Sequence, residues 1–142
     1  MKVSARNVFK GKVGAVKTGA VNAEVDVVLE GDDHLTAVIT VESVKTLALA
    51  VGKPVVAMVK APWVMLMTDQ ANVRLSARNC LAGTIKSVQS GAVNAEVTLA
   101  LPGGTEISAI VTRESVNELG LKPGVAATAV IKASSIILGV PG

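Results

Sequence analysis

Alternation of apolar and polar residues is the clearest pattern in the chain, and it predicts strands. Between residues 20 and 29, Val21, Ala23, Val25, Val27 and Leu29 occupy every second position, with mostly polar residues between them. A period of two indicates a strand with one buried face. Similar stretches predict further strands at 3–16, 35–40, 55–60 and 63–67, the first of them interrupted by glycines.

One short helix is predicted between the third and fourth strands, from Val41 to about Leu49. Thr40 is a favourable N-cap residue, and Glu42 lies in the first turn, where the helix dipole favours a carboxylate. Turn-forming residues at 17–19 and 30–33 separate the first three strands. Five short strands with one helix after the third is the element order of an OB-fold, a small Greek-key barrel.

The whole pattern occurs twice. The stretch Gly-Ala-Val-Asn-Ala-Glu-Val at 19–25 recurs unchanged at 91–97, and Ser-Ala-Arg-Asn at 4–7 recurs at 76–79. Similarity at a fixed period marks an internal repeat. We therefore predict an all-β protein of two tandem OB-fold-like five-stranded barrels, each with one short helix. The predicted domains are residues 1–70 and 71–142, joined by a linker at 68–72.

Composition adds expectations about stability and location. A half of about 70 residues buries a marginal core, and Cys80 is the only cysteine, so we expect oligomerisation to supply stability. We expect Cys80 to fill the apolar position that Val8 has in the other copy. One unpaired cysteine suits a reducing compartment, residues 1–6 lead into no signal sequence, and no apolar run could cross a bilayer. These features predict a cytoplasmic protein without a membrane partner.

The chain offers few residues for catalysis. His34 is the only histidine, no Cys/His cluster could bind zinc, and no glycine-rich loop carries the lysine of a P-loop. We predict no enzyme, no cofactor and no metal site.

What both copies share is a set of hydrogen-bond donors, part of it at the predicted helix start, where N–H groups favour anions. Taken alone, Thr40 is a simple N-cap and Lys60 a solvated charge, but the repetition of the set favours an oxyanion pocket. The donors are Ser4, Arg6, Asn7, Asn22, Thr40, Ser43 and Lys60, and in the second copy Ser76, Arg78, Asn79, Asn94, Thr112, Ser115 and Lys132.

These repeated motifs, together with Thr-x-Glu-Ser-Val at 40–44 and 112–116 and Lys-Ala at 60–61 and 132–133, resemble the molbindin (Mop) family, in particular its tandem two-domain members. The resemblance implies OB-fold domains, a cytoplasmic homotrimer, and the binding of molybdate or tungstate for molybdenum storage or homeostasis. It also implies that the metal is bound only as its oxyanion, at domain and subunit interfaces. Members that regulate DNA or drive transport carry a winged helix or a P-loop, neither of which is found here.

The resemblance implies two kinds of anion site. One kind uses Ser4, Arg6, Thr40, Ser43, Lys60 and Ala61, and in the second copy Ser76, Arg78, Thr112, Ser115, Lys132 and Ala133. The other uses Gly19, Ala20, Val21 and Asn22, and in the second copy Gly91, Ala92, Val93 and Asn94. The copies differ where Pro62 and Trp63 replace Ser134 and Ser135, so we expect Ser134 to add a donor and the two sets of sites to differ in affinity.

Two alternative functions would involve no oxyanion. A structural oligomerisation module would explain the valines but not the doubled donor set. An OB-fold that binds single-stranded nucleic acid needs a basic groove with aromatic stacking platforms, whereas this chain has a net charge of +3 and only Phe9 and Trp63 as aromatics. We therefore expect no nucleic-acid partner.

Overall fold

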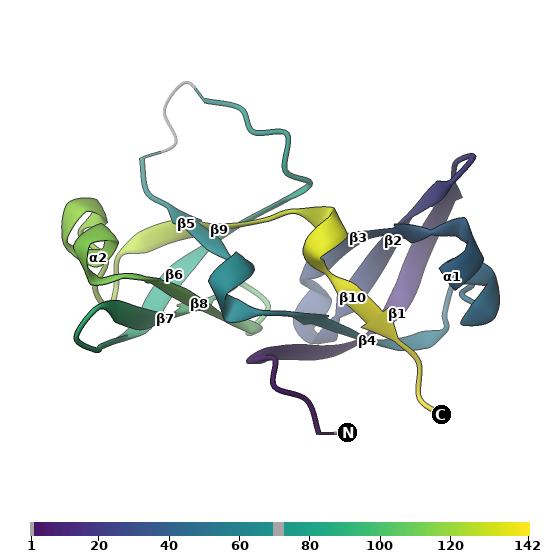
Figure 1. The fold of residues 1–142 in the computed structure, drawn as a ribbon, viewed down its shortest axis with the longest axis horizontal. Coiled ribbons are helices and arrows are strands. Elements are labelled where there is room, and N and C mark those ends of the chain that lie inside the picture. The colour runs from purple at the N-terminus through teal and green to yellow at the C-terminus, as the bar shows by residue number, and fades with distance from the viewer. Residues whose placement is uncertain (1, 70–72) are drawn as a thin grey trace.

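The computed structural model describes residues 2–69 and 73–142, which form two five-stranded antiparallel sheets (Figure 1). The first half contributes β1 (Asn7–Thr18), β2 (Asn22–Leu29), β3 (His34–Thr40), α1 (Val41–Thr46), β4 (Pro54–Val59) and β5 (Met65–Met67). The second contributes β6 (Asn79–Ser90), β7 (Asn94–Ala100), β8 (Glu106–Thr112), α2 (Arg113–Leu119), β9 (Ala126–Ile131) and β10 (Ile137–Gly139). The all-β prediction with two short helices is confirmed.

The two halves exchange their fifth strands. The first sheet has the order β10-β4-β1-β2-β3 and the second the order β5-β9-β6-β7-β8. In Figure 1, β10 accordingly lies beside β4, and β5 beside β9. Our prediction that each fifth strand completes its own half is wrong, because the 3-10 turn after β4, at residues 61–63, leads the chain across to the edge of β9. Neither sheet is therefore built from residues 1–70 or 71–142 alone, and the predicted boundary between them lies outside the described residues.

The predicted inner face of β2 and β7 is buried. Val25, Val27 and Val97 have no exposed surface, and Ala23 and Ala95 are 2% exposed. Val21 is an exception at 71% exposure, because it lies in the turn before β2 rather than in the strand. Its counterpart Val93 is 72% exposed for the same reason.

Strand and helix ends differ from the prediction in detail. β1 is one continuous strand that starts at Asn7 rather than at residue 3, and its glycine at position 14 lies at a register shift between Val13 and Ala15 instead of breaking the strand. α1 ends at Thr46, before the predicted Leu49. Thr40 caps it as predicted, since its hydroxyl accepts a hydrogen bond from the Ser43 N–H.

Two buried asparagines clasp the halves together. The side chain of Asn7 accepts a hydrogen bond from the Ser108 N–H at 2.7 Å and donates one to the Ser108 carbonyl at 2.8 Å. Asn79 forms the same pair of bonds with the backbone of Thr36, at 2.8 and 2.7 Å. Each asparagine is at most 2% exposed, and each links the first strand of its own half to the third strand of the other, β1 to β8 and β6 to β3.

The turns between the second and third strands of each half also meet. A Cβ on Gly31 would overlap the Gly103 carbonyl, and one on Gly103 would overlap the Gly31 carbonyl. The Asp33 carboxylate secures this contact by accepting hydrogen bonds from the backbone N–H groups of Gly103 and Thr105. The contact therefore depends on two glycines that stand at equivalent positions of the repeat.

Neither α1 nor α2, nor any other helix in the described part of the chain, has the length and apolar character needed to cross a membrane.

Replacement of Gly31 by alanine tests the contact between the turns. Gly31 has φ +77° and Gly52 has φ +91°, but nothing lies within 4 Å of a Cβ at Gly52. Gly52→Ala should therefore cost only the backbone penalty of the left-handed region, about 1–2 kcal/mol. Gly31→Ala should cost about 1–3 kcal/mol more, because the turns must separate. Urea unfolding of both variants measures the difference, and equal losses would mean that the contact is not required.

Candidate functional site

One cavity brings together four of the predicted donors of the second copy. Its volume is about 430 Å³, and its polar lining comes from Ser76, Arg78, Lys132 and Ser134. We call it the Lys132 cavity. Ser76 and Arg78 precede β6, whereas Lys132 and Ser134 follow β9, and these strands pair so that Asn79 faces Ile131. The pairing of β6 with β9 thus places two separate donor segments at one end of the sheet.

Part of the apolar wall of this cavity comes from the other half. Val38 of β3 and Met65 of β5 line it together with Leu75 and Val130. Met65 reaches it only because β5 pairs with β9, with Met65 opposite Val130. The cavity is therefore lined by residues of both halves of one chain.

The first copy has a counterpart. Ser4 and Lys60 line a smaller cavity of about 200 Å³, with Val3, Met58 and Ile137 where the larger one has Leu75, Val130 and Met65. The exposed side chain of Trp63 also lines it, and the Lys60 Nζ lies 6.0 Å from the centroid of the indole ring. Ala61 and Ala133 are buried at 1% and 6% exposure, so of these two predicted residues only the backbone could reach an anion.

The predicted segment 19–22 lies against the start of α1. Asn22 and Thr40 are directly opposite in the register of β2 and β3, and the Val41 N–H donates to the Val21 carbonyl at 2.8 Å. Thr40 donates in turn to the Ser43 hydroxyl at 2.8 Å, which leaves the proton of that hydroxyl for another acceptor. The second copy repeats this arrangement. Asn94 is opposite Thr112, and the Arg113 N–H donates to the Val93 carbonyl. The hydroxyl oxygens of Thr112 and Ser115 are 2.8 Å apart.

Gly19 and Asn22 line a third cavity, of about 220 Å³, with Lys17, Glu24 and Val38. Val38 also lines the Lys132 cavity, so the two cavities are neighbours on β3. Ala20 and Val21, like Ala92 and Val93, are exposed and line none of the cavities described here.

Within one chain, the predicted donors are grouped differently from the expectation. Thr40 and Ser43 were expected with Ser4 and Lys60, but within one chain they lie beside the 19–22 segment of their own copy. The Lys132 cavity is lined by Val38 from the first copy, not by Thr112 and Ser115 from the second. The reason is that the third strand of one half faces the donor segments of the other, as the Asn79 clasp on Thr36 shows.

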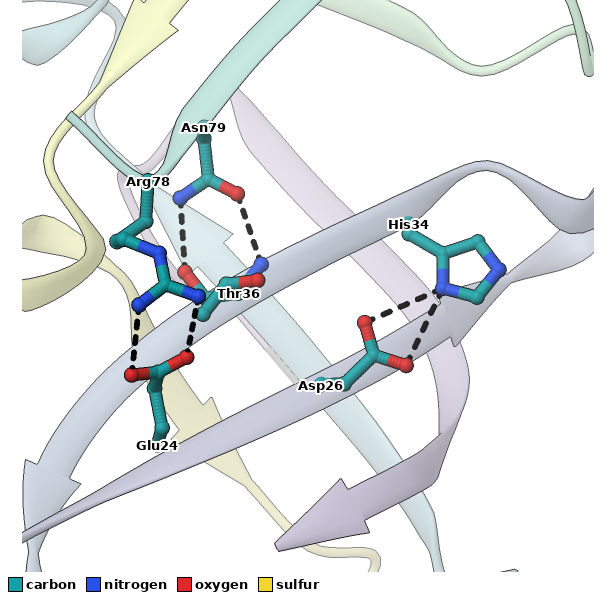
Figure 2. A network of polar contacts seen from close by, with 6 residues as sticks. All are labelled: Glu24, Asp26, His34, Thr36, Arg78 and Asn79. Atoms are coloured by element: carbon teal, nitrogen blue, oxygen red, sulfur yellow. Dashed lines mark hydrogen bonds and ion pairs between the residues drawn. The ribbon is translucent and has the colours of Figure 1, made fainter. Parts of the chain in front are cut away.

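The predicted arginines are paired across the halves, and Figure 2 shows the pair of Arg78 with Glu24. Arg78 forms a bidentate ion pair with Glu24 through both terminal nitrogens, at 2.6 and 2.8 Å. Arg6 donates to both carboxylate oxygens of Glu96 from one nitrogen, Nη2, at 2.6 and 2.8 Å. Arg78 lines the Lys132 cavity and Glu24 lines the neighbouring one. The glutamate stands at the same position of both copies, and this repetition is the sequence signal that could have indicated the pairing.

Asn7 and Asn79 do not belong to the donor set. Both side chains are buried and bonded to the backbone of the opposite half, as Figure 2 shows for Asn79 and Thr36. They position the segments that carry the donors beside them in sequence. We therefore assign them a structural role rather than the predicted binding role.

Lysine and hydroxyl groups are the main hydrogen-bond donors that a ligand could use at these cavities. The part of the chain that the structure describes contains no ion pair to Lys132, and the carboxylate of Glu24 is occupied by Arg78. A cation with N–H and O–H donors around it suits a small anion whose oxygens only accept hydrogen bonds. Among residues 2–69 and 73–142, no group of three or more His, Cys, Asp or Glu residues could hold a metal ion.

Two other residues lie away from the cavities. His34 begins β3, and its Nδ1 lies 3.1 and 3.2 Å from the two carboxylate oxygens of Asp26, as Figure 2 shows. Cys80 is exposed on β6. The prediction that it fills an apolar position is wrong, because Val8 at the equivalent position also faces outward, with 38% exposure.

Comparison with known proteins gives consistent matches over the whole chain. The TOBE domain matches residues 3–66 and again 75–138. Among solved structures, the cytoplasmic molybdate-binding protein ModG, in a crystal form with molybdate bound, is 69% identical, with a TM-score of 0.95 over 99% of this chain and 100% of that one.

Curated relatives include the molybdenum transport protein ModE of Azotobacter vinelandii, 48% identical over all of this chain and 52% of its own length. The molybdenum-pterin-binding protein MopA of Rhodobacter capsulatus is 44% identical over 99% of this chain and 52% of its own length. The chain thus spans about half the length of these two relatives.

Proposed function

Because the chain belongs to the TOBE-domain family, with two TOBE domains in tandem, we propose that it binds molybdate, and tungstate in the same sites, as the intact oxyanion. The observation that carries the proposal is the Lys132 cavity, where a lysine and the hydroxyls of Ser76 and Ser134 meet at the junction of the two halves. The likeness to ModG supports molybdate as the ligand. The role is storage or homeostasis in the cytoplasm, without catalysis and without a further cofactor.

The chemistry of the donors explains the choice of anion. Molybdate at neutral pH is a tetrahedral dianion with acceptors only, so every N–H or O–H in the pocket finds an oxygen. Phosphate keeps at least one proton, which would face other donors and lose its partner. An unmet buried polar group costs about 1–3 kcal/mol, which corresponds to roughly a tenfold to hundredfold loss in affinity. Sulfate has no proton, and its smaller size must exclude it because its oxygens reach fewer donors at once.

The remaining donors come from neighbouring copies of the chain. In a single chain the set of Thr40, Ser43 and Asn22 stands at the surface, beside an exposed Val21. Such exposed apolar residues near donors fit subunit interfaces. We include a homotrimer in the proposal, with anion sites of both predicted kinds completed between subunits.

Light scattering on the intact chain tests the oligomer. We expect a mass of about three chains of 14.4 kDa, because Val21 and Val93 remain exposed in the single chain. A stable monomer at micromolar concentration would contradict the interfacial sites.

Competition dialysis against labelled molybdate tests the function itself. Tungstate should compete fully, sulfate weakly and phosphate hardly at all, because only tungstate matches molybdate in shape, charge and lack of a proton. As a control for the nucleic-acid alternative, a labelled single-stranded oligonucleotide should remain unshifted in a gel. Phosphate displacing molybdate at comparable concentration would mean that the pocket contains a committed acceptor, and the donor model would be wrong.

Replacement of single donors tests the placement of the sites. Lys132→Ala should weaken molybdate binding more than Ser115→Ala, because a charge-assisted hydrogen bond contributes about 1.5–3 kcal/mol and a neutral one about 0.5–1.5 kcal/mol. Titration calorimetry measures both, and Lys122→Ala, an exposed lysine beyond α2, is the matched control. If the two variants bind like the control, the proposed second-copy donors are misplaced.

A further inference from the structure

The two lysine cavities are related by the internal repeat, yet their linings differ at several side chains. Ser4 and Lys60 of the smaller cavity correspond to Ser76 and Lys132 of the larger one, 72 positions apart. The apolar walls correspond as well, including the exchanged residues Ile137 and Met65. The chain thus contains two versions of one pocket, and any difference between them is confined to a few side chains.

The main difference is Trp63. It lines the smaller cavity, whereas the equivalent position of the repeat is Ser135 and the preceding one is Ser134 instead of Pro62. The backbone is the same at both places: a 3-10 turn, with the N–H of Trp63 on the Lys60 carbonyl and that of Ser135 on the Lys132 carbonyl, each at 2.9 Å. Because this turn is the same, side chains contribute to the difference between cavities of about 200 and about 430 Å³: Trp63 lines only the smaller one, whereas Val38 and Arg78 line only the larger one.

Trp63 also acts on the lysine. The Lys60 ammonium group lies 6.0 Å from the ring centroid, within the range in which a cation is attracted to an aromatic face. An anion in the smaller cavity must compete with the ring for this lysine. The position also lacks donors that the larger cavity has, because Pro62 has no N–H and the indole offers only one N–H in place of a hydroxyl.

We propose that Trp63 makes the two pockets unequal, so that the chain has a tighter oxyanion site at Lys132 and a weaker, more size-restricted one at Lys60. This inference rests on the proposed function and deepens it. Trp63 is the specificity-determining residue of the weaker site, and as the only tryptophan of the chain it reports on that site alone.

Reciprocal substitutions test the proposal in the intact chain. Titration calorimetry of the wild type with sodium molybdate should resolve two affinity classes, and tryptophan fluorescence should change only as the weaker class fills. Trp63→Ser should tighten the weaker class about threefold to tenfold, the amount expected of one added neutral hydrogen bond. Ser135→Trp should weaken the tighter class by a similar factor and leave the other unchanged.

Two further variants keep the result interpretable. Val51→Ser replaces an apolar residue that is 71% exposed and lines neither cavity, and it should bind molybdate like the wild type. Trp63→Phe retains an aromatic face and should leave the weaker class close to its wild-type affinity, even if Trp63→Ser folds poorly.

The outcomes separate the two proposals. If the chain binds molybdate but Trp63→Ser and Ser135→Trp leave the affinities of both classes unchanged, the role of Trp63 is overturned and the proposed function stands. Tryptophan fluorescence that follows the tighter class also overturns it. Absence of all molybdate binding by the folded wild type overturns the proposed function, and the inequality of the sites with it.

Discussion

The exchange of the fifth strands is the constraint on which the rest of the structure depends. A four-stranded sheet made from one half would leave the edge of β4 or β9 with unpaired N–H and C=O groups, and an open edge of this kind invites pairing with other chains. β10 and β5 cover these edges from the opposite half. The asparagine clasps and the two Arg–Glu pairs then add polar contacts of fixed geometry between the halves.

The candidate sites follow from this exchange. The segment that carries Lys132 lies against β3 of the first half, so that a donor set from one copy meets a wall from the other. The exposed Arg–Glu pairs contribute little to stability, about 0–1 kcal/mol each. Their larger effect is electrostatic, because Glu24 neutralises Arg78 and leaves Lys132 as the charge that an anion would meet.

The sequence predicted the features that depend on neighbouring residues and missed the contacts between residues far apart in the chain. The buried alternation of Ala23, Val25 and Val27 and the Thr40 cap depend on neighbours along the chain, and both are present in the structure. The partner of β5 could not be predicted, because the edge strands of two similar halves offer the same hydrogen-bonding pattern. The pairing of Arg78 with Glu24, 54 residues away, likewise depends on the packing of the halves and could not be predicted.

Within the candidate site, the residue types were predictable and their grouping was not. Ser76, Arg78, Lys132 and Ser134 do lie together. Asn79 lies directly next to Arg78 in sequence, but Asn79 is the first residue of β6 and bonds to the opposite half, whereas Arg78 precedes the strand.

The exchanged strands also bear on how the chain acquires its structure during synthesis. β4 ends at Val59, whereas its partner β10 begins only at Ile137, so the ribosome must make the strands of the second half before β4 can find its partner. Many of the contacts that define each sheet therefore join residues far apart in the chain, a topology that slows folding. Until then the first half carries an open β4 edge, and two nascent chains held close together could pair through it. The same geometry that joins the halves within one molecule would, between two molecules, produce a domain-swapped dimer.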